Sequence, residues 1–396
     1  MNSNNQGLPM RYAFFITIFA LLQLFSLGTA LSLQWWLQPW QIATSQTMIW
    51  IAVFVITNGL LLLSVKRAFA NSYRWISGWM LVMHFVLLTA LLTSLLYGGY
   101  GLIMSTMGDA ITTPVSMTSV SIDNGLRALA VTIFIGLFML SLYSAYVPVV
   151  RRVSVQIDKP LPKPLKLAVA SDLHLGRLFG SNAIDRLQRL VVKHKADILL
   201  MPGDIMDDNT QAFADYEMAV NLTKLVKSVP YGTYATLGNH DLYGHEQPIS
   251  ESLRSAGVTL LNDEVQCIHH GSAPIWLVGR FDNHKSQRVA TTELLTQVDT
   301  KQPIILLDHR PSNITEHSQL PIDLQVSGHT HNGQIFPANF IVNAINRLGY
   351  GYEAIGKGHF VVSSGYGFWG IPFRLGSRSE IWLISLTGNP VRSAHL

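Results

Sequence analysis

The sequence has a single cysteine and few charged residues. Asp, Glu, Lys and Arg make up 13% of the 396 residues, against the roughly 25% of an ordinary soluble domain. Cys267 alone can form no internal disulfide and has no second thiol with which to share a zinc site. The formal net charge is +4, and no dense run of lysine and arginine is interleaved with aromatic residues. We therefore expect no nucleic-acid partner.

Long apolar runs are abundant, since 48% of the chain is hydrophobic. Four runs cover residues 12–37, 48–65, 75–104 and 126–150, and each is long enough to cross about 30 Å of hydrocarbon as a helix. Six tryptophans lie near the ends of these runs, where indole rings favour the headgroup layer: Trp35, Trp36, Trp40, Trp50, Trp75 and Trp79. The sequence therefore predicts a four-helix transmembrane bundle over residues 1–150.

Basic residues between and after the apolar runs predict the orientation. Lys66, Arg67 and Arg74 lie between the second and third runs, and further lysines and arginines follow the fourth. By the positive-inside rule, everything after Arg151 is cytoplasmic. We expect a multi-pass integral protein of a bacterial inner membrane. His84 lies in the third run, but no span carries a carboxylate partner for it, so a neutral structural histidine is favoured over an ion relay.

The second part of the chain has a different pattern. Residues 151–164 are basic and contain three prolines, which predicts an extended linker held near anionic headgroups. From residue 165 short apolar runs alternate with helical spacing, which indicates an α/β domain over 165–396. The runs supply enough strands for two sheets: 165–170, 198–201, 234–237, 258–261, 275–278, 304–307, 324–326, 360–362 and 381–386.

Polar side chains follow five of these runs. Each cluster alone is more typical of a turn or a surface pair. In open α/β sheets, however, ligands gather beyond the carboxyl ends of the strands, so five such endings are expected to converge on one rim. If the clusters had no such role, several polar groups would stay buried and unpaired, at a cost of several kcal/mol. The predicted metal ligands are Asp172, His174, Asp204, Asn239, His309, His329 and His331.

These clusters resemble the five motifs of the calcineurin-like metallophosphoesterase superfamily. The motifs are Asp172-x-His174, Gly203-Asp204, Gly238-Asn239-His240-Asp241, His309 and Gly328-His329-x-His331. The segments 327–334 and 365–376 are further similar to the YkuE-like branch, some members of which carry N-terminal transmembrane helices. Asn332 stands where that branch would have glycine. The resemblance implies a two-sheet α/β/β/α sandwich following the membrane bundle.

The resemblance also implies a role for each residue. One metal ion would be held by Asp172, His174, Asp204 and His331, and a second by Asp204, Asn239, His309 and His329, with Asp204 bridging the two. His240 would be a catalytic residue that stabilises the transition state or protonates the leaving alkoxide, and Asp241 would orient its ring. Oxygen and imidazole ligands suit two divalent ions of manganese, iron or zinc.

The expected activity is metal-dependent hydrolysis of a phosphate ester through a metal-activated hydroxide. We expect a phosphodiesterase or pyrophosphatase that acts on a membrane-proximal or lipid-linked substrate, with membrane lipids as partners. The motifs leave a phosphomonoesterase or phosphoprotein phosphatase open as an alternative. A non-catalytic membrane scaffold or sensor is a third hypothesis, and transport has only the spans and His84 in its favour. The sequence does not predict the oligomeric state.

Overall fold

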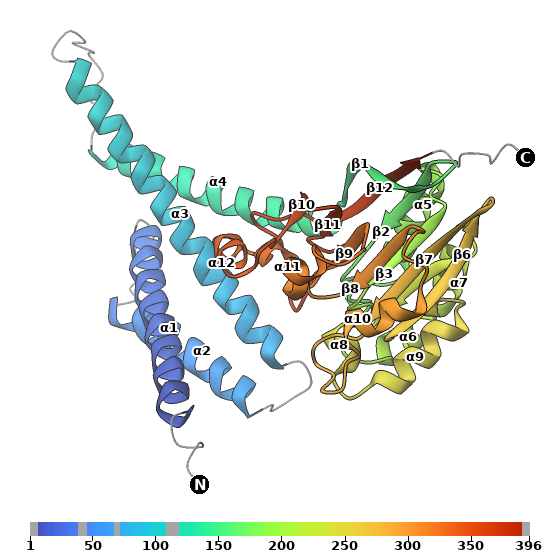
Figure 1. Ribbon diagram of the computed structural model, residues 1–396. Helices are drawn as coiled ribbons and strands as arrows, with labels where there is room; N and C mark the ends of the chain where they lie inside the picture. Colours follow the sequence, from blue (N-terminus) through green and yellow to red (C-terminus); the bar gives the residue numbers. More distant parts are fainter. Residues whose placement is uncertain (1–6, 39–45, 67–71, 108–118, 390–396) are drawn as a thin grey trace, which may run out of the picture. The chain divides into compact units, whose positions relative to one another are not determined.

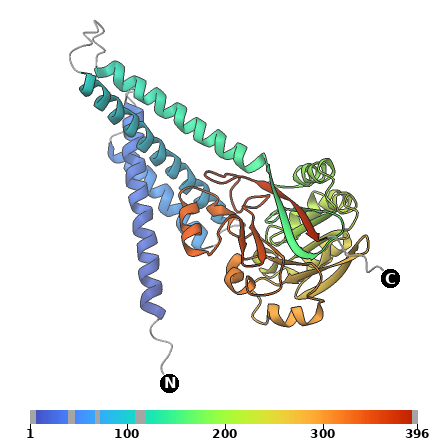
Figure 2. The same cartoon turned by 45° about the horizontal axis from the view of Figure 1, so that its top comes forward.

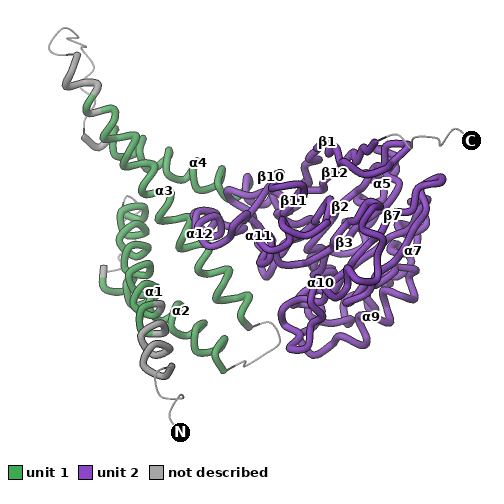
Figure 3. The backbone as a smooth tube through the Cα atoms, viewed as in Figure 1, with its two compact units in different colours: residues 1–139 green, residues 140–396 purple. Residues whose placement is uncertain are grey.

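The computed structural model describes residues 7–38, 46–66, 72–107 and 119–389. The chain divides into two compact units, residues 1–139 and 140–396, which Figure 3 draws in green and purple. The division falls inside the fourth helix, so the last turns of that helix belong to the second unit. The predicted loops 38–47 and 105–125 lie partly outside the described residues.

The first unit is helical (Figure 1). It contains α1 (Gly7–Leu37), α2 (Gln46–Val65), α3 (Ser72–Met107) and the first part of α4 (Ser119–Tyr146). Within the described residues three segments are long and apolar enough to cross a membrane: Thr47–Val65, Tyr73–Tyr100 and Ile122–Tyr146. The chain is therefore membrane-associated. The count of four spans is confirmed for three helices only, and a span in α1 stays a prediction.

Small polar contacts join the helices of this unit. Ser26 Oγ donates to Thr57 Oγ1 at 3.1 Å, and the Gln23 and Asn58 amides pair at 3.1 and 3.2 Å, which connects α1 to α2. Paired hydroxyls and amides satisfy one another, as they must in an apolar environment. His84 also has an interaction partner.

The predicted linker over 151–164 is wrong for most of its length. α4 ends at Tyr146, and strand β1 (Val149–Pro160) begins three residues later and pairs in parallel with β12 (Glu380–Asn389). The fourth span was predicted to reach residue 150, but residues 149 and 150 already belong to the sheet. Arg151 and Arg152 are exposed on this edge strand, whereas Lys159 is partly buried. Because the strand pairs with β12, the catalytic domain begins before residue 165.

Two six-stranded mixed sheets form the second unit (Figures 1 and 2). In the first sheet the order is β1-β12-β2-β3-β4-β5, with β2 to β5 parallel and β12 antiparallel to β2. In the second the order is β10-β11-β9-β8-β7-β6, where β7, β8, β9 and β11 are parallel. The remaining strands are β2 (Leu165–Val169), β3 (Ile198–Pro202), β4 (Thr233–Thr236), β5 (Thr259–Leu260), β6 (Glu264–His270), β7 (Ala273–Arg280), β8 (Ile304–Asp308), β9 (Leu324–Ser327), β10 (Gly351–Ile355) and β11 (Gly358–Val362).

Helices cover the outer faces of the sheets. Leu167, Leu200, Ile275 and Leu307 belong to an apolar core shared by both sheets. A second core packs helical residues such as Leu187 against the first sheet, and a third lies against the second sheet. The predicted α/β/β/α sandwich is confirmed. Its helices are α5 (Ser181–Lys193), α6 (Gln211–Asp215), α7 (Met218–Val226), α8 (Asn239–Leu242), α9 (Glu246–Ser255), α10 (Thr291–Leu294), α11 (Ile314–His317) and α12 (Ala338–Ile345), with 3-10 turns η3 (Leu295–Gln297), η4 (Pro311–Asn313) and η5 (His331–Gly333).

Candidate metal centre

All the predicted ligands come shortly after the ends of parallel strands. Asp172 and His174 follow β2, Asp204 follows β3, and Asn239 begins α8 beyond β4. In the second sheet His309 follows β8, and the two histidines of the GHTH motif follow β9. Five of the seven predicted ligands have a positive φ: Asp172, His174, Asp204, His329 and His331. Non-glycine residues in this conformation are strained and cluster at functional sites.

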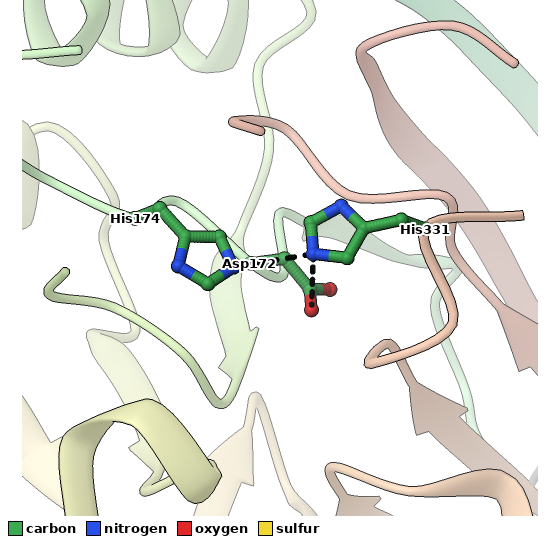
Figure 4. A group of neighbouring side chains, drawn as sticks. All are labelled: Asp172, His174 and His331. Carbon is green, nitrogen blue, oxygen red and sulfur yellow. Dashed lines mark hydrogen bonds and ion pairs between the residues drawn. The ribbon is translucent and has the colours of Figure 1, made fainter. Parts of the chain in front are cut away.

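The first group of neighbouring side chains is Asp172, His174 and His331 (Figure 4). Nε2 of His174 lies 3.1 Å from Nε2 of His331, which in turn lies 3.5 Å from Oδ1 of Asp172. The backbone N–H of His329 donates to Oδ1 of Asp172 at 2.9 Å, which fixes the carboxylate. Two imidazole nitrogens and a carboxylate oxygen therefore point at one position, and these are the donors that divalent transition metals accept.

The second group is Asp204, His309 and His329. Nδ1–H of His309 donates to the carbonyl of Pro202 at 2.8 Å, so the lone pair of the neutral ring is on Nε2, which lies 3.2 Å from Oδ2 of Asp204. Asn239 adds an amide oxygen to this group. Its Nδ2 donates to Tyr243 Oη at 2.8 Å, and its buried Oδ1 has no hydrogen-bond partner among the described residues. That oxygen is free to act as a ligand.

Asp204 lies between the two groups. Its Oδ2 is 3.2 Å from Nε2 of His309 and 3.8 Å from Nε2 of His174, and its Oδ1 accepts from the backbone N–H of His240 at 2.9 Å. One carboxylate oxygen thus faces an imidazole nitrogen from each group. The buried, unpartnered ligand atoms and the shared carboxylate fit a pair of divalent ions bridged by Asp204.

Burial dominates the protonation of the histidines. It lowers the pKa of His174 to about 3 and that of His329 to about 3, and burial together with the Arg374 charge lowers the pKa of His331 well below its usual range. These rings are therefore neutral at physiological pH, as metal ligands must be. His309 differs, because the Asp204 carboxylate outweighs the effect of burial and raises its pKa to about 10. A cation bound at Nε2 would replace that proton.

His240, the predicted catalytic residue, lies beside the predicted ligand His174, but the prediction that Asp241 orients its ring is wrong. The ring packs against His174 at a centroid distance of 4.8 Å, and its Nδ1 bonds to Asp208 and not to Asp241. Burial lowers the pKa of His240, but the bond to Asp208 and the charge of Asp204 outweigh it and raise the value. Asp208 is therefore the carboxylate that orients the ring and favours its protonated form.

Asp241 instead holds the loop that carries Asp204. Its buried carboxylate accepts from the backbone N–H groups of Ile205 at 3.1 Å, Met206 at 2.9 Å and Gly238 at 3.0 Å. Within the described part of the chain it makes no hydrogen bond to the His240 ring, whose Nδ1 bonds to Asp208. Burial and the charge of Asp204 raise the pKa of Asp241 to about 7.

Three residues near the ligands were missed by sequence reasoning. Asp208 bonds to His240, Tyr243 bonds to Asn239, and the fully buried Arg374 lies against His331. Asp208 and Tyr243 are in loops with no repeated pattern, and Arg374 is in the glycine-rich segment 365–376 that the resemblance singled out. An arginine among the apolar residues of that segment is the one signal that pointed to a buried charged partner.

Two donor groups joined by one carboxylate define a candidate dinuclear metal centre. The model of the calcineurin-like phosphoesterase family matches residues 165–333, which contain all of these donors. The chain is 33% identical over 245 residues to a metallophosphoesterase of Aquifex aeolicus, a match that covers 60% of this chain and 92% of the relative. The chain belongs to the calcineurin-like phosphoesterase family. Members of this family use two divalent metal ions.

Two further relatives extend the comparison. A metallophosphoesterase of Helicobacter pylori strain J99 is 32% identical over 243 residues, covering 60% of this chain. The chain spans 64% of the length of that relative. YkuE of Bacillus subtilis, also named a metallophosphoesterase, is 26% identical over 226 residues, which cover 56% of this chain and 78% of YkuE. The predicted resemblance to the YkuE-like branch is confirmed.

Proposed function

We propose that the protein is a dinuclear metal-dependent phosphoesterase, specifically a phosphodiesterase or pyrophosphatase acting on a membrane-proximal or lipid-linked substrate. The observation that carries this proposal is the position of Asp204, whose Oδ2 faces His309 Nε2 at 3.2 Å and His174 Nε2 at 3.8 Å. A pair of bound divalent ions would supply an acidified water and neutralise the phosphoryl oxygens.

The residues of the chain have distinct tasks in this proposal. Asp172, His174 and His331 hold one ion, and Asn239, His309 and His329 hold the other, with Asp204 shared. His240 delivers a proton to the leaving oxygen, since the charges of Asp208 and Asp204 favour its protonated ring. Asp241 keeps Asp204 in place through the backbone of residues 205 and 206.

The membrane part supports the choice of substrate. The span Ile122–Tyr146 leads directly into β1 of the catalytic sheets, so the site is held near the bilayer and meets its lipids at high effective concentration. We further propose a multi-pass inner-membrane protein whose catalytic unit is cytoplasmic, because the basic residues that follow the fourth span favour the inside.

The test is hydrolysis by the full chain in lipid nanodiscs with added manganese, zinc or iron. Bis-p-nitrophenyl phosphate and p-nitrophenyl phosphate are compared for the wild type, Asp204→Asn, His240→Ala and the control Asp215→Asn on exposed α6. We expect metal-dependent cleavage of the diester that Asp204→Asn abolishes, His240→Ala lowers and Asp215→Asn leaves intact. Faster cleavage of the monoester would favour a phosphomonoesterase. No turnover with two ions bound would favour the scaffold hypothesis.

A further inference from the structure

Helix α12 (Ala338–Ile345) exposes its large apolar side chains, whereas longer surface helices of the catalytic unit such as α5 bury theirs. Most of its exposed side chains are apolar and follow helical spacing: Phe340, Ile341, Ala344 and Ile345, with the polar Asn343 also exposed and Pro337 exposed just before the helix. Phe340 is 63% exposed, Ile341 61% and Ile345 75%. No side chain of α12 is fully buried. A surface helix in water has the opposite arrangement, with its apolar stripe against the core.

The inner side of α12 is partly polar. Ala338, Asn339 and Val342 are half-buried, as is Asn346 just after the helix, whose Nδ2 donates to the carbonyl of Val342 at 2.8 Å. The helix has no charged residue. α5, by comparison, buries Ile184, Leu187 and Val191 against the first sheet. No side chain of α12 belongs to the hydrophobic cores of the described part of its unit, so the apolar side of the helix faces away from them.

A short series of contacts connects α12 to the membrane span α4. The Phe340 ring packs edge-on against Phe336, and the backbone N–H of Phe336 donates to Leu375 at 2.6 Å. Arg374, which precedes Leu375, donates its backbone N–H to the carbonyl of Ser141 in α4 at 3.0 Å. All of these residues belong to the second unit. Only the segment that contains Arg374 and Leu375 lies between the start of α12 and the end of a membrane-spanning helix in this series of hydrogen bonds.

The end of α4 has the features of a headgroup boundary. The exposed Tyr143 ring stacks under the Arg378 guanidinium at 4.9 Å, and Arg378 Nη2 donates to the carbonyl of Val147 at 3.0 Å. Tyrosine and arginine are common where a helix leaves the hydrocarbon, because each combines an apolar stem with a polar end. The bilayer surface is therefore expected beside the segment to which α12 is attached.

We propose that α12 is a membrane-docking surface whose side chains Phe340, Ile341 and Ile345 insert into the boundary between lipid headgroups and acyl chains. An apolar face with no charge suits this boundary, where a short helix can lie in the plane of the membrane. Because η5, which contains His331, is in direct contact with α12, docking would hold one edge of the metal centre at the lipid surface. The proposal does not depend on hydrolysis.

The test uses the single cysteine of the chain. In a Cys267→Ser background of the full chain in phosphatidylcholine nanodiscs, cysteines are introduced as Ile341→Cys or Ile345→Cys and labelled with the environment-sensitive dye NBD. The negative control is Val220→Cys, since Val220 is an exposed apolar residue of α7, and the positive control is Leu95→Cys within α3. Lipids spin-labelled at the acyl chain serve as quenchers.

We expect the labels at residues 341 and 345 to emit at shorter wavelength and to be quenched several-fold more than the label at residue 220, with the strongest quenching at residue 95. Quenching no greater than at residue 220 would overturn the proposal. A shift to shorter wavelength without lipid quenching would also overturn it, because it would show that protein covers α12, either transmembrane helices of the same chain or a second copy. Catalytic activity enters none of these readouts.

Discussion

Nη2 of Arg374 lies 2.9 Å from Nδ1 of His331, the ring nitrogen turned away from Asp172. The same nitrogen atom of Arg374 donates to the carbonyls of Ser364 at 2.6 Å and Gly367 at 2.7 Å. The side chain is fully buried, and burial lowers its pKa to about 10. A fixed positive charge behind His331 disfavours protonation of that ring and leaves Nε2 to a metal ion.

Replacement of Arg374 should therefore affect metal binding before it affects chemistry. Arg374→Met removes the charge behind His331 and leaves two buried carbonyls unpaired, each at a cost of about 1–3 kcal/mol. We expect a lower unfolding temperature and a 10–100-fold weaker affinity for one of two ions, the usual effect of losing an outer-shell partner. Metal content by mass spectrometry and thermal unfolding measure both. Arg347→Met, which breaks the exposed pair with Glu353, is the control; two fully bound ions in Arg374→Met would contradict the prediction.

Asp208 should matter for catalysis and not for metal binding. Its carboxylate bonds to Nδ1 of His240 and contributes to the raised pKa of that ring. Asp208→Asn keeps the shape but removes the charge, so we expect kcat to fall roughly 10–100-fold, less than the about 10²–10⁴-fold that a complete general acid contributes. Both ions should remain bound. An equal fall in the exposed control Asp215→Asn would show that the loss has another cause.

Asp241 should matter for stability. Its carboxylate is the acceptor for three buried backbone N–H groups, those of Ile205, Met206 and Gly238. Asp241→Ala leaves all three unpaired, and since each costs about 1–3 kcal/mol we expect a loss of at least about 3 kcal/mol. Asp241→Asn retains one acceptor oxygen and should lie between wild type and Asp241→Ala in unfolding temperature. If Asp241→Ala unfolded like the wild type but lost activity, the orienting role predicted from sequence would have to be restored.

Gly238 should tolerate no side chain. A Cβ at this position would lie 2.2 Å from Oδ1 and 2.4 Å from the backbone nitrogen of Asp204. Gly238→Ala must therefore displace Asp204, and we expect both metal ions to bind less tightly. The matched control is Gly271→Ala, since Gly271 is in a turn with φ of 65° and no atom lies within 4 Å of its Cβ position. That control should lose about 1–2 kcal/mol of stability from backbone strain and keep its metal content, as measured by calorimetric titration.

The parts of the fold that could be read from sequence are those buried on both faces. All nine apolar runs became strands. β1, β6 and β10 were missed, and each is an edge strand; β5, the fourth edge strand, was found because it lies in the apolar run 258–261. An edge strand that is exposed on alternate residues and carries polar side chains leaves no apolar run. In β1 the two arginines that suggested a linker are exposed, and Lys159 is partly buried.

The candidate site could likewise be predicted only in part from the sequence. The predicted ligands follow parallel strands, and the carboxyl ends of such strands meet at one edge, so order along the chain was enough to bring them together. Asp208 could not be found by this argument. It reaches His240 across 32 residues from an irregular loop, whereas Asp241 is adjacent in sequence but points to another set of donors. Adjacency in a short helix does not predict which side chains meet.

Because α4 leads directly into β1, the end of a membrane-spanning helix is part of the catalytic unit. Carbonyls at the end of α4 accept hydrogen bonds from the catalytic unit: Ser144 from the Ser379 N–H at 2.9 Å, Tyr146 from Arg186, and Val147, just after the helix, from Arg378. When bilayer thickness differs from the length of an apolar helix, the mismatch is relieved in part by tilt. Because residues 140–146 belong to the second unit, a tilt of α4 would act on the first sheet through these hydrogen bonds.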